Sequence, residues 1–200
     1  MSMEKGQLSI HTENFLPIIK KWLYSDRDIF IRELISNCCD AVAKRRMVGQ
    51  IPDDYQPRVT VRVDKEHRIL SFTDNGVGMT AEEVRKYINQ VAFSGANDFM
   101  EKYKDSGEQI IGHFGLGFYS AFMVADKVRI DTLSCLPDAK AVCWESDGSV
   151  EYTMEETERE EVGTTVTLYL NNESDEFLDG NTVKSTIRKY CSFMPTPIYC

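Results

Sequence analysis

The chain has 200 residues, of which 42% are hydrophobic and 28% charged, and its formal net charge is -9 at pH 7. This composition is that of a globular protein large enough to bury one sizeable core. The acidic balance excludes a general affinity for nucleic acids or anionic membranes, because both require a basic surface. Any anionic ligand must therefore be held by a local arrangement of groups.

The remaining bulk features favour a cytoplasmic protein. Residues 1–15 lack the apolar stretch and cleavage site of a signal peptide, and no run approaches the roughly 18 apolar residues of a membrane span. Six cysteines without CxxC spacing and three scattered histidines give no zinc pattern. We expect the cysteines to be reduced and mostly buried thiols.

The first predicted elements are two helices. Apolar positions at helical spacing predict one helix over residues 12–24 and another from about residue 28 to residue 47. In the second helix Glu33, Asn37 and Asp40 lie three and four residues apart, so they share one face. We expect this face to point inward, where each polar group needs a partner because an unpaired one costs roughly 2–7 kcal/mol.

The next segment has the periodicity of strands. Residues 58–63 and 68–74 alternate apolar and polar side chains on either side of a short turn, which predicts an antiparallel hairpin. The second strand leads into the glycine-containing loop DNGVGM, residues 74–79. Thr80, followed three residues later by Glu83, forms a capping box, so a helix is predicted to begin there.

The rest of the chain is predicted to alternate strands with irregular segments. Residues 89–117 contain helical pieces broken by glycines, and a long segment of this kind inside a compact domain is usually functional. The other predicted elements are a short buried helix at 118–126, strands at 127–134, 141–146, 149–155 and 162–170, a solvated acidic loop at 155–161, a helix at 181–194 and a final extended segment at 195–200.

The loop DNGVGM indicates a ligand site at the end of a strand. Gly76 and Gly78 lack a Cβ atom, so the backbone can bend around a flat ligand. Asp74 is then a fixed acceptor for an amino group such as that of adenine, with Met79 as an apolar wall. A plain hairpin turn and a calcium loop are the alternatives, although Val77 and Met79 stand where calcium ligands are expected.

A second glycine-rich stretch, IGHFGLGFYS, runs into a predicted helix. Backbone N–H groups at a helix N-terminus bind phosphate without any net positive charge. No GK[ST] follows, so this is not a Walker loop, and close helix packing is the alternative explanation of the glycines.

The predicted helix at residues 28–47 supplies groups for phosphate chemistry. Glu33 is suited to orienting and deprotonating a water that attacks a phosphate, and Asn37 to offering an oxygen to Mg²⁺. The alternatives are a glutamate paired with Arg32 and a satisfied buried amide.

Together these motifs resemble the nucleotide site of the ATPase superfamily that includes DNA gyrase B, MutL, histidine kinases and the heat-shock protein 90 chaperones. The stretches that carry the resemblance to the heat-shock protein 90 family, in its bacterial HtpG-like form, are IFIRELISNCCDA, DNGVGMT, IGHFGLGFYSAFMVADKV and VGTTVTLYL. The similarity covers nearly all of the chain.

The resemblance implies an α+β fold of the Bergerat type, a two-layer α/β sandwich in which helices over a mixed, mostly antiparallel sheet form the nucleotide pocket. It implies that residues 1–200 are a single N-terminal ATP-binding domain with a nucleotide lid at about residues 89–117, and that the middle and C-terminal domains are absent from this chain.

The resemblance also implies site residues. It assigns Glu33 as the catalytic glutamate, Asn37 as the Mg²⁺ ligand and Asp74 as the acceptor of the adenine amine. The other nucleotide-binding residues that it implies are Asp40, Lys44, Gly78, Met79, Gly112, Gly115, Gly117, Phe118 and Thr164.

The implied function is that of a molecular chaperone that binds ATP or ADP with Mg²⁺ and uses ATP hydrolysis in a clamp cycle to assist the folding of client proteins. Its implied partners are clients, co-chaperones and a second copy held through the C-terminal domain. The isolated domain is expected to be a weak ATPase, because the family takes a catalytic arginine from the next domain. The alternatives are a gyrase B or MutL-type ATPase, which the acidic charge disfavours, and a nucleotide sensor without turnover, which Glu33 disfavours.

The chain departs from the family at one place. Where the family usually reads LGTIAKSGT this chain reads INQVAFSGA, so Asn89 replaces a glycine, Phe93 a lysine and Ala96 a threonine. We expect Asn89 to stiffen the hinge of the lid and Phe93 to remove a cation near it. Cys38 and Cys39 are expected to be packed thiols, with a redox-sensitive site as the alternative.

Overall fold

The computed structural model describes residues 4–7, 27–49, 51–89, 117–149 and 151–200. The strands are β1 (Glu4–Gln7), β2 (Val59–Asp64), β3 (Ile69–Asp74), β4 (Ala125–Leu133), β5 (Val142–Ser146), β6 (Glu151–Glu156), β7 (Gly163–Leu170) and β8 (Ile198–Tyr199). The helices are α2 (Ile29–Val48), α3 (Ala81–Tyr87) and α5 (Gly180–Cys191), with two 3-10 helices, η1 (Gly117–Met123) and η2 (Asp175–Leu178).

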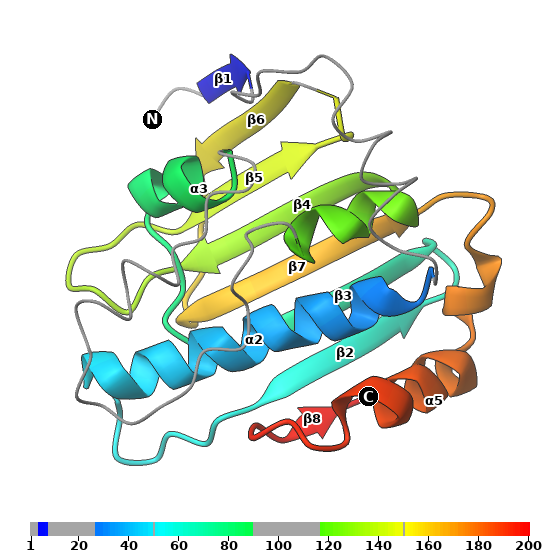
Figure 1. The fold of residues 1–200 in the computed structure, drawn as a ribbon. Coiled ribbons are helices and arrows are strands. Elements are labelled where there is room, and N and C mark those ends of the chain that lie inside the picture. The colour runs from blue at the N-terminus through cyan, green and yellow to red at the C-terminus, as the bar shows by residue number, and fades with distance from the viewer. Residues whose placement is uncertain (1–3, 8–26, 50, 90–116, 150) are drawn as a thin grey trace.

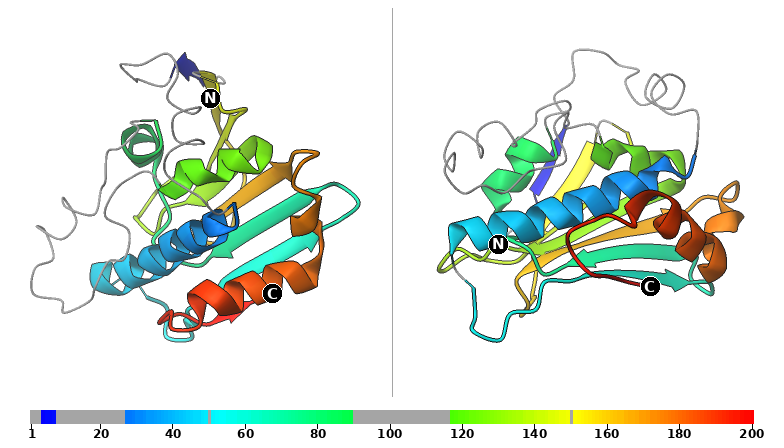
Figure 2. Two further views of the ribbon diagram at one scale, coloured as in Figure 1. Left: turned by 45° about the vertical axis from the view of Figure 1, so that its right-hand side comes forward. Right: turned by 60° about the horizontal axis from the view of Figure 1, so that its bottom comes forward.

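The strands form one eight-stranded sheet in the order β1-β6-β5-β4-β7-β3-β2-β8. Among the described strands only β2 and β8 pair in parallel, so the predicted α+β class with a mixed, mostly antiparallel sheet is confirmed. The helices lie on one face of the sheet, and α2 runs lengthwise over it (Figures 1 and 2). None of the described helices is both long and apolar enough to cross a membrane.

Most predicted elements are confirmed in the described part of the chain. Helix α2 differs by one residue at each end from the prediction, β2 and β3 form the predicted hairpin, and Thr80 makes both bonds of the capping box with Glu83. The predicted helix at 12–24 lies outside the described residues.

Several predicted boundaries were wrong, among them the end of the helix predicted at 181–194, because α5 ends at Cys191. The helix predicted at 118–126 is the 3-10 helix η1, which ends at Met123, and β4 begins at Ala125. The acidic loop was predicted to begin at Glu155, but this residue and Glu156 belong to β6 because they pair with β5. Alternating burial along a paired strand outweighs the acidic composition there.

The core lies between the helices and the inner face of the sheet. Phe30 of α2 makes edge contacts with Phe72 of β3 and Phe177 of η2, at centroid distances of 6.3 and 4.9 Å. Such aromatic pairs add about 0.5–1.5 kcal/mol beyond the burial of their area. The largest fully buried side chains are Trp144, Tyr119, Phe30, Phe72, Phe177, Ile31, Leu34, Ile35, Leu70, Ile130 and Leu168.

The inner face of the sheet carries one row of polar side chains. Along β3 every second residue is buried, so Asp74 points to the same side as Leu70 and Phe72. The strand register places Thr164 of β7 opposite Asp74, and Thr132 of β4 opposite Thr164. All three are buried. We call Asp74, Thr164 and Thr132 the inner polar row, and it lies where β3 runs into the glycine loop.

The glycine loop is fixed between α2 and the end of β4. The N–H of Val77 donates to the carbonyl oxygen of Ala41 on α2 (2.8 Å), and the N–H of Cys135 donates to the carbonyl oxygen of Val77 (2.8 Å). A Cβ atom on Gly76 would lie 2.3 Å from the backbone of Ala41, and one on Gly78, whose φ is 64°, would lie 1.9 Å from the carbonyl oxygen of Leu133. The glycines therefore permit contact between backbones of the protein itself. Their expected role in bending the backbone around a flat ligand stays a prediction.

Gly76→Ala is expected to destabilise the fold by about 3 kcal/mol, because the new methyl group overlaps helix backbone that has no room to move. The matched control is Gly180→Ala at the start of α5, where an added Cβ meets nothing within 4 Å. Urea unfolding of the two variants and the wild type measures the difference. Equal midpoints for both variants would show that the loop does not need this contact.

Candidate functional site

Asp74 is the buried acid at the centre of the site. Its side chain is 4% exposed, and Oδ1 accepts a hydrogen bond from the N–H of Gly76 (2.8 Å). Burial raises the pKa of Asp74 to about 7, and the hydrogen bond from Gly76, the charge of Arg159 and bonds from Cys38 and Thr164 lower it only in part. This carboxylate is an acceptor that the fold desolvates and holds in one orientation.

Cys38 is the closest thiol to this acid. Its side chain is 3% exposed and bonds to Asp74, and burial together with the charge of Asp74 raises the pKa of the thiol well above its usual value. The thiol therefore stays protonated, donates a hydrogen bond to the carboxylate and is a poor nucleophile. The expected packed thiol is what the structure shows; that it bonds to Asp74 was missed from the sequence.

The inner polar row links Asp74 to the loop beyond it. Thr132 Oγ1 lies 2.9 Å from Thr164 Oγ1 and accepts from the N–H of Met79 (2.9 Å). Thr132 was not among the candidate residues. Its signal in the sequence was a threonine at an inward position of a strand that is otherwise apolar on that side, and only the register shows that it meets Thr164.

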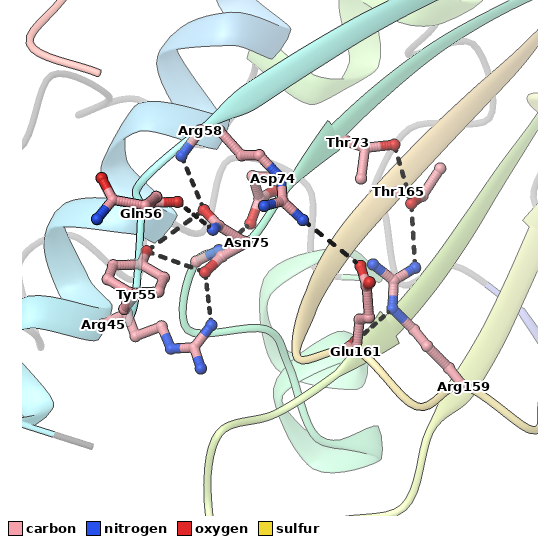
Figure 3. Close-up of polar contacts among 11 residues, drawn as sticks. Arg45, Tyr55, Gln56, Arg58, Thr73, Asp74, Asn75, Arg159, Glu161 and Thr165 are labelled. Atoms are coloured by element: carbon pink, nitrogen blue, oxygen red, sulfur yellow. Dashed lines mark hydrogen bonds and ion pairs between the residues drawn. The ribbon is translucent and has the colours of Figure 1, made fainter. Parts of the chain in front are cut away.

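Asn75 anchors the loop from the opposite side, as Figure 3 shows. Its carbonyl oxygen accepts from Arg45 Nη1 (2.7 Å) and from the hydroxyl of Tyr55 (3.0 Å). Its side chain accepts from the N–H of Arg58 (2.9 Å) and donates to the carbonyl oxygen of Gln56 (2.7 Å). Because Asn75 is the next residue in the chain and these hydrogen bonds hold it in place, Asp74 has little freedom to move.

Arg159 brings a positive charge to the same end of the sheet. Its Nη1 donates to the carbonyl oxygen of Asp131 and to Thr165 Oγ1, both at 3.0 Å, and its Nε donates to the carbonyl oxygen of Glu161 (2.8 Å). Figure 3 shows the contacts with Thr165 and Glu161. The guanidinium is held by neutral oxygens, so its charge remains available to favour the ionised form of Asp74.

The predicted stripe on α2 lies at the margin of its buried face. Asp40 is buried and Glu33 is half-buried, but Asn37 is exposed. The expectation that all three point inward was therefore wrong for Asn37, because core positions such as Leu34 and Cys38 occupy the centre of the buried face.

Lys44 continues the stripe one turn beyond Asp40. Burial lowers the pKa of its ammonium group, while the charges of Asp40 and Glu83 act in the opposite direction. A partly buried cation is thus held near two acids, at the end of α2 that adjoins the glycine loop.

Glu33 lies between an arginine and a glycine. Its Oε1 accepts from Nε (3.0 Å) and Nη2 (2.5 Å) of Arg32, which is one of the pairings considered from the sequence. A Cβ atom on Gly117, the first residue of η1, would lie 2.6 Å from Glu33 Oε2. The absence of a side chain at Gly117 is what lets η1 approach this carboxylate.

The other candidate residues lie in different parts of the structure and make different contacts. Met79 is half-buried against the core, Gly78 packs on Leu133, and the ring of Phe118 packs on Trp144 at a centroid distance of 5.8 Å. Gly112 and Gly115 lie outside the described residues, as do Phe93, Ala96 and nearly all of the segment expected to form the lid.

Comparison with known proteins gives the family. The family model described as histidine kinase-, DNA gyrase B-, and HSP90-like ATPase matches residues 25–173. The chain belongs to this ATPase family. The match contains α2, the glycine loop and the inner polar row, so the site described above lies inside the part that defines the HSP90-like ATPases.

Curated relatives narrow the resemblance. The chain is 50% identical over 198 residues to the chaperone protein HtpG of Bacteroides fragilis (strain YCH46) and to that of Bacteroides thetaiotaomicron, and 48% identical over 199 residues to that of Porphyromonas gingivalis (strain W83). In each case the alignment covers 98% of this chain and 29% of the relative. The resemblance to the heat-shock protein 90 family is confirmed, and the chain spans less than a third of these relatives.

The stability of the wild type relative to Asp74→Asn is expected to fall as pH rises toward 7. The pKa of about 7 in the folded state exceeds the ordinary value of 3.8, so the folded state binds more protons in this window and folding becomes less favourable by about 1.4 kcal/mol per pH unit. Above about pH 7 the difference levels off. Urea unfolding of both proteins between pH 5 and 8 measures it, and parallel curves would contradict a raised pKa.

Proposed function

We propose that this chain is the ATP-binding and ATP-hydrolysing domain of a molecular chaperone of the heat-shock protein 90 type. The observation that carries the proposal is the meeting of α2 with the glycine loop. The bond between Val77 and Ala41 joins the helix that carries the stripe of Glu33, Asn37 and Asp40 to the loop that follows the buried carboxylate of Asp74. An acceptor for a base at one end and a carboxylate suited to water activation at the other are the two requirements of a nucleotide hydrolase.

At the adenine end, Asp74 accepts a hydrogen bond from the exocyclic amine of the base. The ionised form accepts the stronger hydrogen bond, and the raised pKa of Asp74 makes the population of that form sensitive to pH near neutrality. Thr164 assists from the neighbouring strand, fixed by its contact with Thr132 (2.9 Å). Met79 and Gly78 line this end, and Met79 is already held in place by its backbone bond to Thr132.

At the phosphate end, Glu33 takes the proton of the attacking water. The bond from Arg32 orients one carboxylate oxygen, while the other faces Gly117. Asp40 and Lys44 lie along the same side of α2, and the loop that contains Gly112, Gly115, Gly117 and Phe118 covers the phosphates.

Mg²⁺ fits this donor set as a nucleotide-bound ion. Within the described residues no group of three or more His, Cys, Asp or Glu side chains could hold a metal by itself. Mg²⁺ usually keeps several waters and takes only one or two protein ligands besides the phosphates. The exposed amide oxygen of Asn37 would be such a ligand, and the ion would neutralise phosphate charge.

The wider activity follows from the HtpG-like chaperones that the chain resembles. We infer a single ATP-binding domain over residues 1–200 with a lid at about 89–117, and a longer protein that forms a homodimer through a C-terminal domain and acts on client proteins with co-chaperones. We expect weak turnover by the isolated domain. A cytoplasmic location is supported by six free cysteines.

Asp74→Asn is expected to weaken ADP binding by about a hundredfold, because the neutral amide oxygen accepts a weaker hydrogen bond from the adenine amine than a carboxylate does. Isothermal titration with ADP and Mg²⁺ measures the change. The control is Asp126→Asn at an exposed position of β4, which should bind as the wild type does. Near wild-type affinity in Asp74→Asn, with the fold intact, would remove the adenine role from Asp74.

Glu33→Ala is expected to bind ATP with about wild-type affinity but to lose hydrolysis by about a hundredfold or more in the full-length protein. Phosphate release under saturating ATP measures turnover. Glu66→Ala, in the exposed turn after β2, is the matched control. Turnover retained in Glu33→Ala would move the role of base to another group.

A further inference from the structure

Asn89 makes a buried hydrogen bond that the catalytic proposal does not use. Its side chain is 6% exposed, and Oδ1 accepts from the indole Nε1 of Trp144 (2.9 Å). The residue lies two positions after the end of α3, and its own N–H donates to the carbonyl oxygen of Val84 on that helix (3.3 Å). The end of α3 is thereby bonded to β5.

Trp144 is the central side chain of an aromatic cluster. It is fully buried, meets Phe118 edge-on at a centroid distance of 5.8 Å and stacks with Tyr152 at 6.3 Å. A buried indole N–H needs an acceptor. Asn89 supplies this acceptor, which holds the indole ring of Trp144 in place next to α3 and η1.

A second bond closes the connection. The hydroxyl of Tyr119 on η1 donates to the carbonyl oxygen of Ile88, the residue before Asn89. Helix η1 is therefore attached to the end of α3 through Tyr119 and to Trp144 through Phe118. Its first residue, Gly117, is the one that lies against Glu33.

We propose that Asn89 and Trp144 are positioning residues for hydrolysis: their hydrogen bond sets how closely Gly117 approaches Glu33, and so holds the carboxylate toward its water. The proposal rests on the assigned role of Glu33. A glycine, which the resemblance led us to expect at position 89, has no side-chain acceptor and could not make this bond. Asn89 is bonded to the core through Trp144, and its expected effect on the hinge of the lid stays a prediction.

The test compares Asn89→Ala and Trp144→Phe, singly and together, in the full-length protein. Each removes one partner of the same bond, so turnover is expected to fall about tenfold in either, and the double variant should be no slower than the slower single variant. Affinity for ADP should change by less than about twofold, because neither residue contacts Asp74 or its loop. The control is Asn172→Ala, an exposed asparagine after β7, with turnover as in the wild type.

A spectroscopic signal reports on the bond itself. The chain has two tryptophans, so the ¹⁵N-indole spectrum of this chain contains one signal for each, and Trp144→Phe identifies the signal of Trp144. In Asn89→Ala that signal should shift and exchange with deuterium at least about tenfold faster, since a hydrogen-bonded buried N–H is protected.

The outcomes separate this proposal from the function on which it rests. Normal turnover in Asn89→Ala together with an altered indole signal overturns the positioning role alone. An equal loss of ADP affinity and turnover also overturns it, because that pattern marks general loss of structure. If Asn89→Ala does not fold, Trp144→Phe decides by the same criteria. A wild-type protein that binds ADP but never hydrolyses ATP overturns the role of Glu33, and this inference with it.

Discussion

The burial of the Asp74 carboxylate is the constraint on which the site depends. An acid removed from water is stable only if neighbouring groups replace the lost hydration. Here the replacements come from separate parts of the chain: a backbone N–H of the glycine loop, the thiol of Cys38 on α2 and the charge of Arg159 after β6. They leave the pKa raised, so the compensation is incomplete. A group that the fold leaves short of partners is well suited to accept one more from a ligand.

Helix α2 combines structural and chemical roles in one element. The centre of its buried face packs on the core through Phe30, Leu34 and Ile35, and the margin of that face carries the polar stripe. The contact between Ala41 and the glycine loop ties the helix to the end of β3, so the distance between Asp74 and the stripe is set by backbone packing and not by flexible side chains. This explains why a small residue is required at Gly76.

Much of the fold was predictable, because it follows from local patterns. The capping box at Thr80, the alternation in β3 and the apolar spacing of α2 each act over a few residues and gave the right elements. Contacts between distant segments were not predictable in the same way. Thr132 joins the site through strand register, and Asn89 finds Trp144 across 55 positions of sequence. The exposure of Asn37 was missed because periodicity identifies a shared face but does not locate the edge of the buried surface.

The order of the strands has a consequence for behaviour in solution. The strands at the two edges of the sheet are the short β1 and β8, of four and two residues, and each pairs with a longer strand inside. Exposed edges of long strands recruit other chains and promote aggregation, and short terminal strands next to proline reduce that risk. Pro197 immediately precedes β8, and its carbonyl oxygen accepts the N–H of Val59. The short strands at the edges of the described sheet therefore cover its longer strands and reduce their tendency to pair with other chains.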